Sequence, residues 1–272
     1  MRKKLRIYFP FALNEIKLQM AYKGAFYFWV FIGTFGSFIS YFLWMAIYGS
    51  TENGMLGGLT RNEMVVYVFM TYATTQIVMV SLSDWVSDDV IKGMVAMNLI
   101  KPIDYRMSLI FRAAGDMLYR TLFPSLFIWI GLEIYKAAAL GMEFVGFGRL
   151  LLYLLSSIMS FLIYILFDFC FGMIAFFTSY VFGLMLIKDA VLSFLTGQLI
   201  PLGFFPQPVQ VLFDFLPFSS MVYTPVMIYL GKYTGPELWL MLGRQVLWAL
   251  ILYLLGSLIW RCVTKRLVVL GG

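Results

Sequence analysis

Hydrophobic residues run along this chain in blocks long enough to cross a membrane. The hydrocarbon core of a bilayer is roughly 30 Å thick, so a helix needs about 20 apolar residues to cross it. Four blocks meet this length on their own: Ala25–Tyr48, Met64–Ser83, Ala113–Ile134 and Leu238–Trp260. Each is predicted to be a transmembrane helix.

A fifth block, Leu150–Ile187, is too long for one ordinary crossing. It holds 38 residues with a single charge, Asp168. As one continuous helix it would be about 57 Å long at 1.5 Å per residue. The block therefore predicts either two passes or one long tilted helix.

The segment Asp84–Arg112 (residues 84–112) interrupts this pattern with four acidic and four basic residues, too many charges for lipid. We expect a cytoplasmic loop that contains a short amphipathic helix, with Ser87 or Asp88 as its cap and Pro102 beyond its end. The apolar positions of this helix are Val90, Ile91, Met94, Val95, Met97 and Leu99. Methionine suits adaptable contacts with another protein.

Two further segments do not read as plain spans. Residues 1–24 place Leu5, Tyr8, Phe9, Leu13, Ile16 and Met20 at helical spacing among basic residues, which predicts a helix in the membrane interface that serves as an anchor or also contacts a partner. Residues 200–231 are broken by prolines. They predict apolar elements that enter the outer leaflet without crossing, either as a gate or as a plug.

Composition supports a membrane protein and limits its chemistry. The chain of 272 residues is 62% hydrophobic and 12% charged, against about 45–50% and about 25% in soluble proteins. With no histidine and only Cys170 and Cys262, we expect no metal site, and two isolated thiols are favoured over a disulfide. Gly231-Lys232 is followed by Tyr233 and makes no phosphate-binding loop. We expect no catalysis and no bound cofactor.

Lysine and arginine are unevenly distributed between the two predicted sides. Thirteen lie in the N-terminal segment, the 84–112 loop and the C-terminus, five lie on the other side (Arg61, Lys136, Arg149, Lys232, Arg244), and Arg120 and Lys188 are ambiguous. Positive residues favour the cytoplasm, so both termini are expected there, which requires an even number of spans; six fits. The net charge of +6 then reflects orientation and not a nucleic-acid partner. Asp116 and Arg120, one turn apart, are predicted to pair near the membrane edge.

Several short motifs occur in the order found in one known family. They are Ile91-Lys-Gly-Met, Leu99-Ile-Lys-Pro-Ile-Asp-Tyr105, Leu195-Thr-Gly-Gln-Leu-Ile-Pro-Leu-Gly-Phe-Phe-Pro206, Leu216-Pro-Phe218, Tyr223-Thr-Pro225, Ile228-Tyr-Leu-Gly231, Gln245-Val-Leu-Trp248 and Gly271-Gly272. With the basic N-terminal helix, they make the chain resemble the permease subunits of type-2 ABC exporters, closest to the drug and viologen exporter branch. Each motif alone is weakly specific.

The resemblance implies a single all-α membrane domain over residues 1–272. It would have six transmembrane helices, an interfacial N-terminal helix, a cytoplasmic coupling helix and a re-entrant hairpin between helices 5 and 6. It also implies a bacterial inner-membrane protein that pairs with a second permease, the same or a sister subunit, and with two copies of an ATP-binding subunit that hold ATP and magnesium.

The same resemblance points to two groups of site residues. The ATPase-coupling interface would comprise Ser87, Asp88, Ile91, Lys92, Gly93, Met94, Asn98, Lys101 and Pro102. The translocation path or gate would comprise Asp168, Gly203, Phe204, Phe205 and Pro206. A carboxylate inside a membrane suggests a functional role; the alternative for Asp168 is a neutral or internally paired structural acid. The family register places Lys188 at the cytoplasmic start of the fifth span.

The expected function is ATP-driven export of a hydrophobic or amphipathic substrate such as a drug, lipid or glycolipid. Two rivals stay open. An ATP-independent secondary transporter or channel would show more paired intramembrane charges and an inverted repeat. A non-transporting scaffold would use the 84–112 loop to dock an assembly factor.

Overall fold

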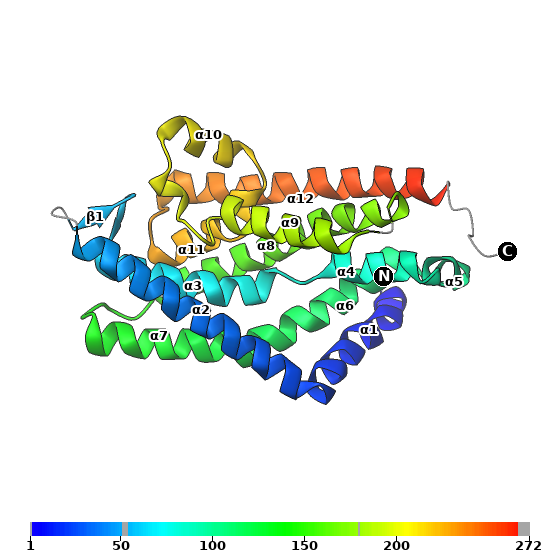
Figure 1. Cartoon of the computed structure of the whole chain (residues 1–272), viewed down its shortest axis with the longest axis horizontal. Coiled ribbons are helices and arrows are strands. Elements are labelled where there is room, and N and C mark those ends of the chain that lie inside the picture. The colour runs from blue at the N-terminus through cyan, green and yellow to red at the C-terminus, as the bar shows by residue number, and fades with distance from the viewer. Residues whose placement is uncertain (1, 51–53, 179, 266–272) are drawn as a thin grey trace.

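The computed structural model describes residues 2–50, 54–178 and 180–265, with side chains from Arg6 onward, and is almost entirely helical (Figure 1). Its α-helices are α1 (Arg2–Ala21), α2 (Lys23–Gly49), α3 (Arg61–Val78), α4 (Leu82–Ile91), α5 (Met94–Ile100), α6 (Tyr105–Arg120), α7 (Leu126–Ala139), α8 (Phe147–Gly172), α9 (Phe182–Leu195), α10 (Gln207–Phe215), α11 (Tyr223–Leu230) and α12 (Gly235–Thr264). A π-helical turn joins α6 to α7, and β1 (Met55–Leu56) pairs antiparallel with β2 (Leu59–Thr60).

Five helical stretches in the described part of the chain are long and apolar enough to cross a membrane. They are Lys23–Gly49, Arg61–Ile91, Tyr105–Ala139, Phe147–Phe176 and Gly235–Thr264. These confirm the four single-block spans and the first half of the long block. The remaining helix of the long block, α9, has 14 residues and measures about 21 Å, which is short of the hydrocarbon core. The sixth span stays a prediction.

The long apolar block Leu150–Ile187 folds as two helices, α8 and α9, and not as one tilted helix. A 3-10 turn, Met173–Phe176, ends α8, and the chain reverses before α9 begins at Phe182. The reversal brings Lys188 Nζ to 2.6 Å from Asp168 Oδ1. The long block therefore supplies one full span and one short helix.

The prediction for the start of the amphipathic loop helix was wrong. That helix, α4, begins at Leu82, after only three non-helical residues that follow α3, and Ser87 lies inside it. The Ser87 Oγ donates to the Ser83 carbonyl at 2.6 Å and is buried, so it cannot act as a cap. Gly93 adopts a left-handed conformation, with φ of 70°, and divides the expected single helix into α4 and α5.

The third span also begins earlier than predicted, at Tyr105 and not at Ala113. Asp104 caps α6 by accepting hydrogen bonds from the backbone N–H groups of Arg106 and Met107. Tyr105, Leu109 and Ala113 recur every four residues and are all buried. The sequence-based prediction excluded this first part of α6 from the span because it contains charged residues.

Helix α1 packs along α6 instead of lying free of the bundle. Its Glu15 is buried and forms an ion pair of 2.7 Å with Arg112. Its Gln19 donates to Asp116 at 2.9 Å, and Asp116 also pairs with Arg120 at 2.9 Å, which confirms the predicted pair. The first helix is therefore joined to the bundle by polar contacts at the end where α4 and α5 lie (Figure 1).

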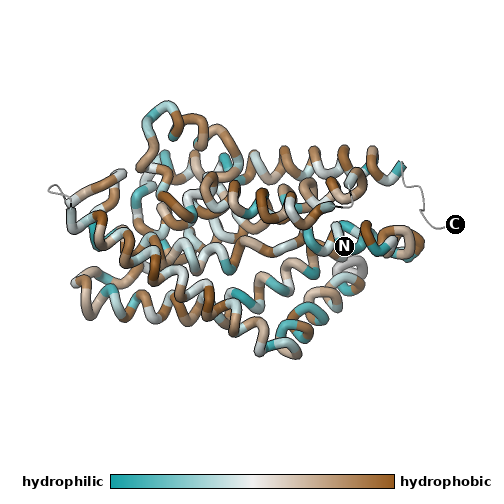
Figure 2. The backbone as a smooth tube through the Cα atoms, viewed as in Figure 1, coloured by the Kyte–Doolittle hydropathy of each residue, from teal (hydrophilic) through white to brown (hydrophobic). Residues whose placement is uncertain are grey.

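The two ends of the bundle differ. Helices α1, α4 and α5 lie at the same end as the end of α12, whereas the β1–β2 hairpin and α10 lie at the opposite end (Figure 1). Between the ends, α2 and α12 are rich in hydrophobic residues (Figure 2), and their Phe31, Trp29 and Leu254 side chains are more than 60% exposed. In a membrane these faces meet lipid or another subunit.

Residues 200–231 form short apolar elements, as the prolines predict. Helix α10 lies on the outside of the hairpin end (Figure 1). Helix α11 is buried from Tyr223 to Tyr229 and packs between α3 and α8. The segment enters the bundle without crossing it as one helix.

Candidate functional site

Helix α5 gives the bundle an exposed apolar tip (Figure 2). Ile100 is 85% exposed, Met97 58% and Ile91 55%, whereas Val95 faces inward and is 2% exposed. Exposed apolar clusters of this kind are typical of protein-contact or membrane-contact surfaces, and methionine side chains can adapt to a partner.

Most residues of the sequence-predicted coupling interface lie on this tip or beside it. Ile91, Lys92, Gly93, Met94, Lys101 and Pro102 are exposed, as is Asp88, and Asn98 is half-buried. Lys92 pairs with Asp88 at 2.7 Å, and Lys101 donates to Asn98 at 2.7 Å. Ser87 is the exception, because it is buried against the bundle.

A polar contact that the sequence analysis missed holds α4 and α5 to α6. The Asp89 carboxylate accepts hydrogen bonds from the Tyr105 hydroxyl at 2.8 Å and from Asn98 Nδ2 at 3.3 Å. The Tyr105 ring in turn stacks on Trp260 of α12, with ring centroids 5.4 Å apart. The tip is thereby connected to two of the long helices. No spacing rule pointed to Asp89, because its partner lies 16 residues away.

A buried ion pair fixes the start of α4. Asp168 of α8 and Lys188 of α9 are 0% and 5% exposed. Asp168 Oδ2 accepts from the Ser83 N–H in the first turn of α4 at 2.6 Å, and Lys188 Nζ donates to Asp168 Oδ1 at 2.6 Å and to Ser83 Oγ at 2.8 Å. This group, which we call the α4 clamp (Ser83, Asp168, Lys188), joins three helices.

Backbone packing supports the clamp. Gly172, at the end of α8, lies against the first turns of α4, where an added Cβ would sit 2.9 Å from the Ser83 Cα and 3.0 Å from the Val86 Cβ. Such close approach leaves α4 little freedom to shift relative to α8. The clamp and the close packing at Gly172 together hold the first turns of α4 in a fixed position against the end of α8.

The four outer gate candidates lie together at the hairpin end, far along the bundle from the clamp. Phe204 packs on Trp44, with centroids 4.8 Å apart, and Gly203 abuts the carbonyl of Gly57 in the β1–β2 turn. Phe205 makes edge contacts with Phe194 and Phe213, each with centroids 5.2 Å apart. Pro206 is the residue before α10 and is exposed. The structure therefore brings Gly203–Pro206 together but does not bring Asp168 to them.

A groove of about 450 Å³ runs along α2 and α3 to the end of α9, beside the Trp44 that Phe204 covers. Its lining combines aromatic residues with uncharged polar ones: Trp29, Gly33, Gly36, Ser37, Ser40, Trp44, Tyr67, Val68, Thr71, Tyr72, Thr75, Gln76, Met79, Ser193, Gln198 and Leu199. The sequence analysis did not single these residues out. The sequence did contain a clue to the groove, because Thr71, Thr75 and Gln76 are polar residues inside a predicted span.

Within the described part of the chain, no group of three or more histidine, cysteine, aspartate or glutamate side chains could hold a metal ion. Cys170 and Cys262 are both free thiols. The polar groups of the clamp are fully engaged with one another.

Comparison with known proteins places this architecture in a family. The family model described as ABC-2 family transporter protein matches residues 35–271. No curated protein matches the chain. Membrane components of this family generally work with separate ATP-binding subunits. The chain belongs to the ABC-2 transporter family and is a multi-pass membrane component of such a transporter.

Proposed function

We propose that this chain is the permease subunit of an ATP-driven exporter of the drug and viologen exporter type. It forms a translocation path with a second permease, either a second copy or a sister subunit. Two ATP-binding subunits dock on the α4–α5 tip and bind ATP and magnesium. Their movement tilts the spans and alternates access to the path.

The observation that carries this proposal is the position of α4 between the tip and the groove. Its far end leads through Gly93 to the exposed apolar residues of α5. Its first turn is held by the α4 clamp to α9, and the C-terminal part of α9 supplies Ser193 to the groove. A displacement of α5 can therefore be transmitted through the packed contacts of α4 and α9 to the residues that line one side of the groove.

The groove is our candidate for the path of the substrate. None of its lining residues carries a charge, and tryptophan, tyrosine, serine, threonine and glutamine alternate along it. Aromatic faces bind apolar rings or chains, and hydroxyl and amide groups bind neutral polar groups. This supports an amphipathic cargo such as a drug, a lipid or a glycolipid. Phe204 packs on Trp44, which is part of the groove lining, and this contact supports the gate role of Gly203–Pro206.

Asp168 has a different place in the proposal from the gate. It does not line the groove, and both of its carboxylate oxygens accept hydrogen bonds. We assign it to positioning α4, and not to contact with the cargo.

The proposed topology has six spans, with both termini in the cytoplasm of a bacterial inner membrane. In support, the predicted cytoplasmic segments, α1, α4–α5 and the end of α12, share one end of the bundle (Figure 1). That end holds the larger set of lysines and arginines. Arg266 and the Gly271-Gly272 motif lie outside the described residues.

The test is co-purification and ATP-dependent transport with the tip altered. Met97→Asp should lose the ATP-binding subunit, because a charge would enter an apolar interface. Met55→Asp makes the same change on an exposed residue of the opposite end and should retain the subunit. An ATP-independent transporter would move cargo in both variants, and a scaffold would move cargo in neither form.

A further inference from the structure

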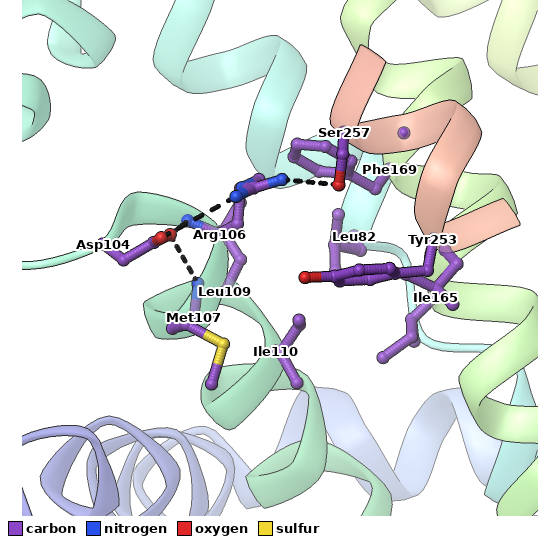
Figure 3. Close-up of a pocket in the computed structure, with 12 residues that line it drawn as sticks. Leu82, Asp104, Arg106, Met107, Leu109, Ile110, Ile165, Phe169, Tyr253 and Ser257 are labelled. Carbon is purple, nitrogen blue, oxygen red and sulfur yellow. Dashed lines mark hydrogen bonds and ion pairs between the residues drawn. The ribbon is translucent and has the colours of Figure 1, made fainter. Parts of the chain in front are cut away.

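A small cavity opens on the outer surface of the bundle between α6, α8 and α12 (Figure 3). It measures about 90 Å³ and is lined mainly by apolar side chains, among them Ile110, Leu166 and Phe169. This volume holds about six water-sized groups, too few for a drug-sized ligand. It suits the end segment of a chain whose remainder lies outside, in the bilayer.

Polar groups of opposite charge meet at one edge of this cavity. Arg106 is 30% exposed at its side chain and donates through Nη1 to Ser257 Oγ at 3.0 Å. Asp104 is 45% exposed, and its Oδ1 caps α6 while its Oδ2 stands 3.9 Å from Arg106 Nη2 (Figure 3). At 3.9 Å the two charges attract, but they leave hydrogen-bonding capacity on both groups.

A third polar group points to the same place. Tyr253 is 53% exposed and its hydroxyl is directed into the cavity (Figure 3). Within the described residues it has no hydrogen-bond partner. A tyrosine at the edge of the membrane with a free hydroxyl is typical of headgroup contact.

The depth of these groups matches the headgroup level. Helix α12 has 30 residues and is about 45 Å long, comparable to a whole bilayer with its headgroups. Ser257 lies seven residues before the end of α12, or about 10 Å along the axis. Arg106 lies in the first turn of α6. Both helices therefore place the charged edge near the boundary between headgroups and hydrocarbon, with the apolar cavity facing the acyl chains.

We propose that this cavity is a binding site for an amine-bearing phospholipid, phosphatidylethanolamine, in the leaflet on the α4–α5 side. Arg106 and Tyr253 bind the phosphate, Asp104 accepts a hydrogen bond from the primary ammonium, and one acyl chain enters the cavity. The carboxylate of Asp104 disfavours lipids with a net negative charge and favours one with an ammonium group that can donate. The site is separate from the groove and does not depend on the proposed transport function.

Its consequence for the bundle follows from position. Arg106 is the neighbour of Tyr105, which joins Asp89 to Trp260. A bound lipid bridges α6 and α12 beside that stack and braces the helices to which the α5 tip is attached.

The experiment measures lipid binding to the purified full-length protein, with whatever subunits accompany it, by native mass spectrometry. The probes are phosphatidylethanolamine and phosphatidylglycerol with identical acyl chains. The wild-type protein should prefer the former. Arg106→Gln should weaken phosphatidylethanolamine binding about tenfold, the effect of one charge-assisted contact. Lys17→Gln, which removes an exposed charge of α1 that does not line the cavity, should leave it unchanged.

Two further variants separate the headgroup from the chain. Asp104→Asn keeps the helix cap, since asparagine caps as well as aspartate, and should abolish the preference between the two lipids while retaining phosphate binding. Ile110→Trp fills the cavity without changing any charge and should weaken both lipids. Wild-type binding without preference, or equal affinities of the wild type, Arg106→Gln and Ile110→Trp, would overturn the proposal.

Discussion

Lys188 Nζ lies 2.6 Å from Asp168 Oδ1, and both side chains are buried where α8, α9 and the first turn of α4 meet. The pair is stabilised by Ser83, which contacts both partners. Because all three helices meet at these two residues, we propose that movement of α4 reaches the spans through this pair.

Removing one partner of this pair should be costly. Asp168→Asn removes the buried counter-charge of Lys188 and leaves the more exposed Asp189, 3.2 Å away, as its remaining ion-pair partner; loss of one buried partner costs up to about 3–5 kcal/mol in comparable pairs. We expect a lower Tm in detergent and a lower yield of the assembled complex. A Tm equal to that of the wild-type protein would contradict the clamp.

The double change Asp168→Leu with Lys188→Met separates stability from coupling. Replacing both charges by apolar groups is often neutral or stabilising, so Tm should recover. The Ser83 N–H would then lose its side-chain acceptor, and the start of α4 would be held less tightly. We expect assembly with the ATP-binding subunit to survive and transport per ATP hydrolysed to fall. Recovery of transport to the wild-type level would show that the clamp serves stability alone.

Tyr105→Phe tests the second attachment of the tip. It removes the hydroxyl that donates to Asp89 but keeps the ring that stacks on Trp260. A hydrogen bond to a charged group contributes about 1.5–3 kcal/mol, so a measurable fall in the free energy of unfolding is expected together with weaker coupling of ATP hydrolysis to transport. Tyr8→Phe, which removes the hydroxyl that accepts the Asp104 N–H, is the matched control and should retain coupling.

The groove is tested by adding bulk to one wall. Ser40→Trp places a large side chain in the groove and should reduce transport strongly while leaving assembly and ATP-binding-subunit association intact. Phe42→Trp, on the outward face of the same helix and 66% exposed, changes an aromatic residue outside the groove and should transport normally. If both variants transport alike, the groove is not the path.

The outer gate is tested by a single methyl group. Gly203→Ala would press its Cβ against the Gly57 carbonyl, so either the hairpin or the Gly203–Pro206 segment must move. Overpacking of this kind typically costs about 1–3 kcal/mol, and the Phe204 contact with Trp44 should loosen. We expect altered transport, measured beside Gly131→Ala, where nothing lies within 4 Å of an added Cβ. Identical behaviour of the two alanine variants would contradict a gate at this position.

Hydrophobic block length predicted the spans well, because the thickness of a bilayer imposes one length on every crossing helix. It failed at Tyr105, where the number of charges decided the prediction, and the cap preference of serine failed at Ser87. The charges of α6 are compatible with a helix because Arg112 pairs with Glu15 of α1, a partner 97 residues away. A helix cap that lies next to its helix in the sequence can be predicted from the sequence. The group that accepts the Ser83 N–H in the first turn of α4 could not, because it is Asp168 of α8.

The exposed apolar residues of the α4–α5 tip could be identified from the sequence. Contacts between residues far apart in the sequence could not. Met94 and Met97 stood out in a polar loop, and both are exposed. Asp168 stood out as a lone acid, but its role could not be read from the sequence, because Lys188 meets it only after the chain reverses. The groove unites residues of α2, α3 and the end of α9, and no periodicity within one helix predicts such a meeting.

The central claim, that this chain is the conduit and a separate subunit supplies the energy, is tested most directly by transport in reconstituted vesicles. The chain should be assayed alone and with its ATP-binding subunit, each with and without ATP and magnesium. We expect accumulation of an amphipathic substrate against its gradient only when subunit and nucleotide are both present. Full pumping by the chain alone without nucleotide would contradict it.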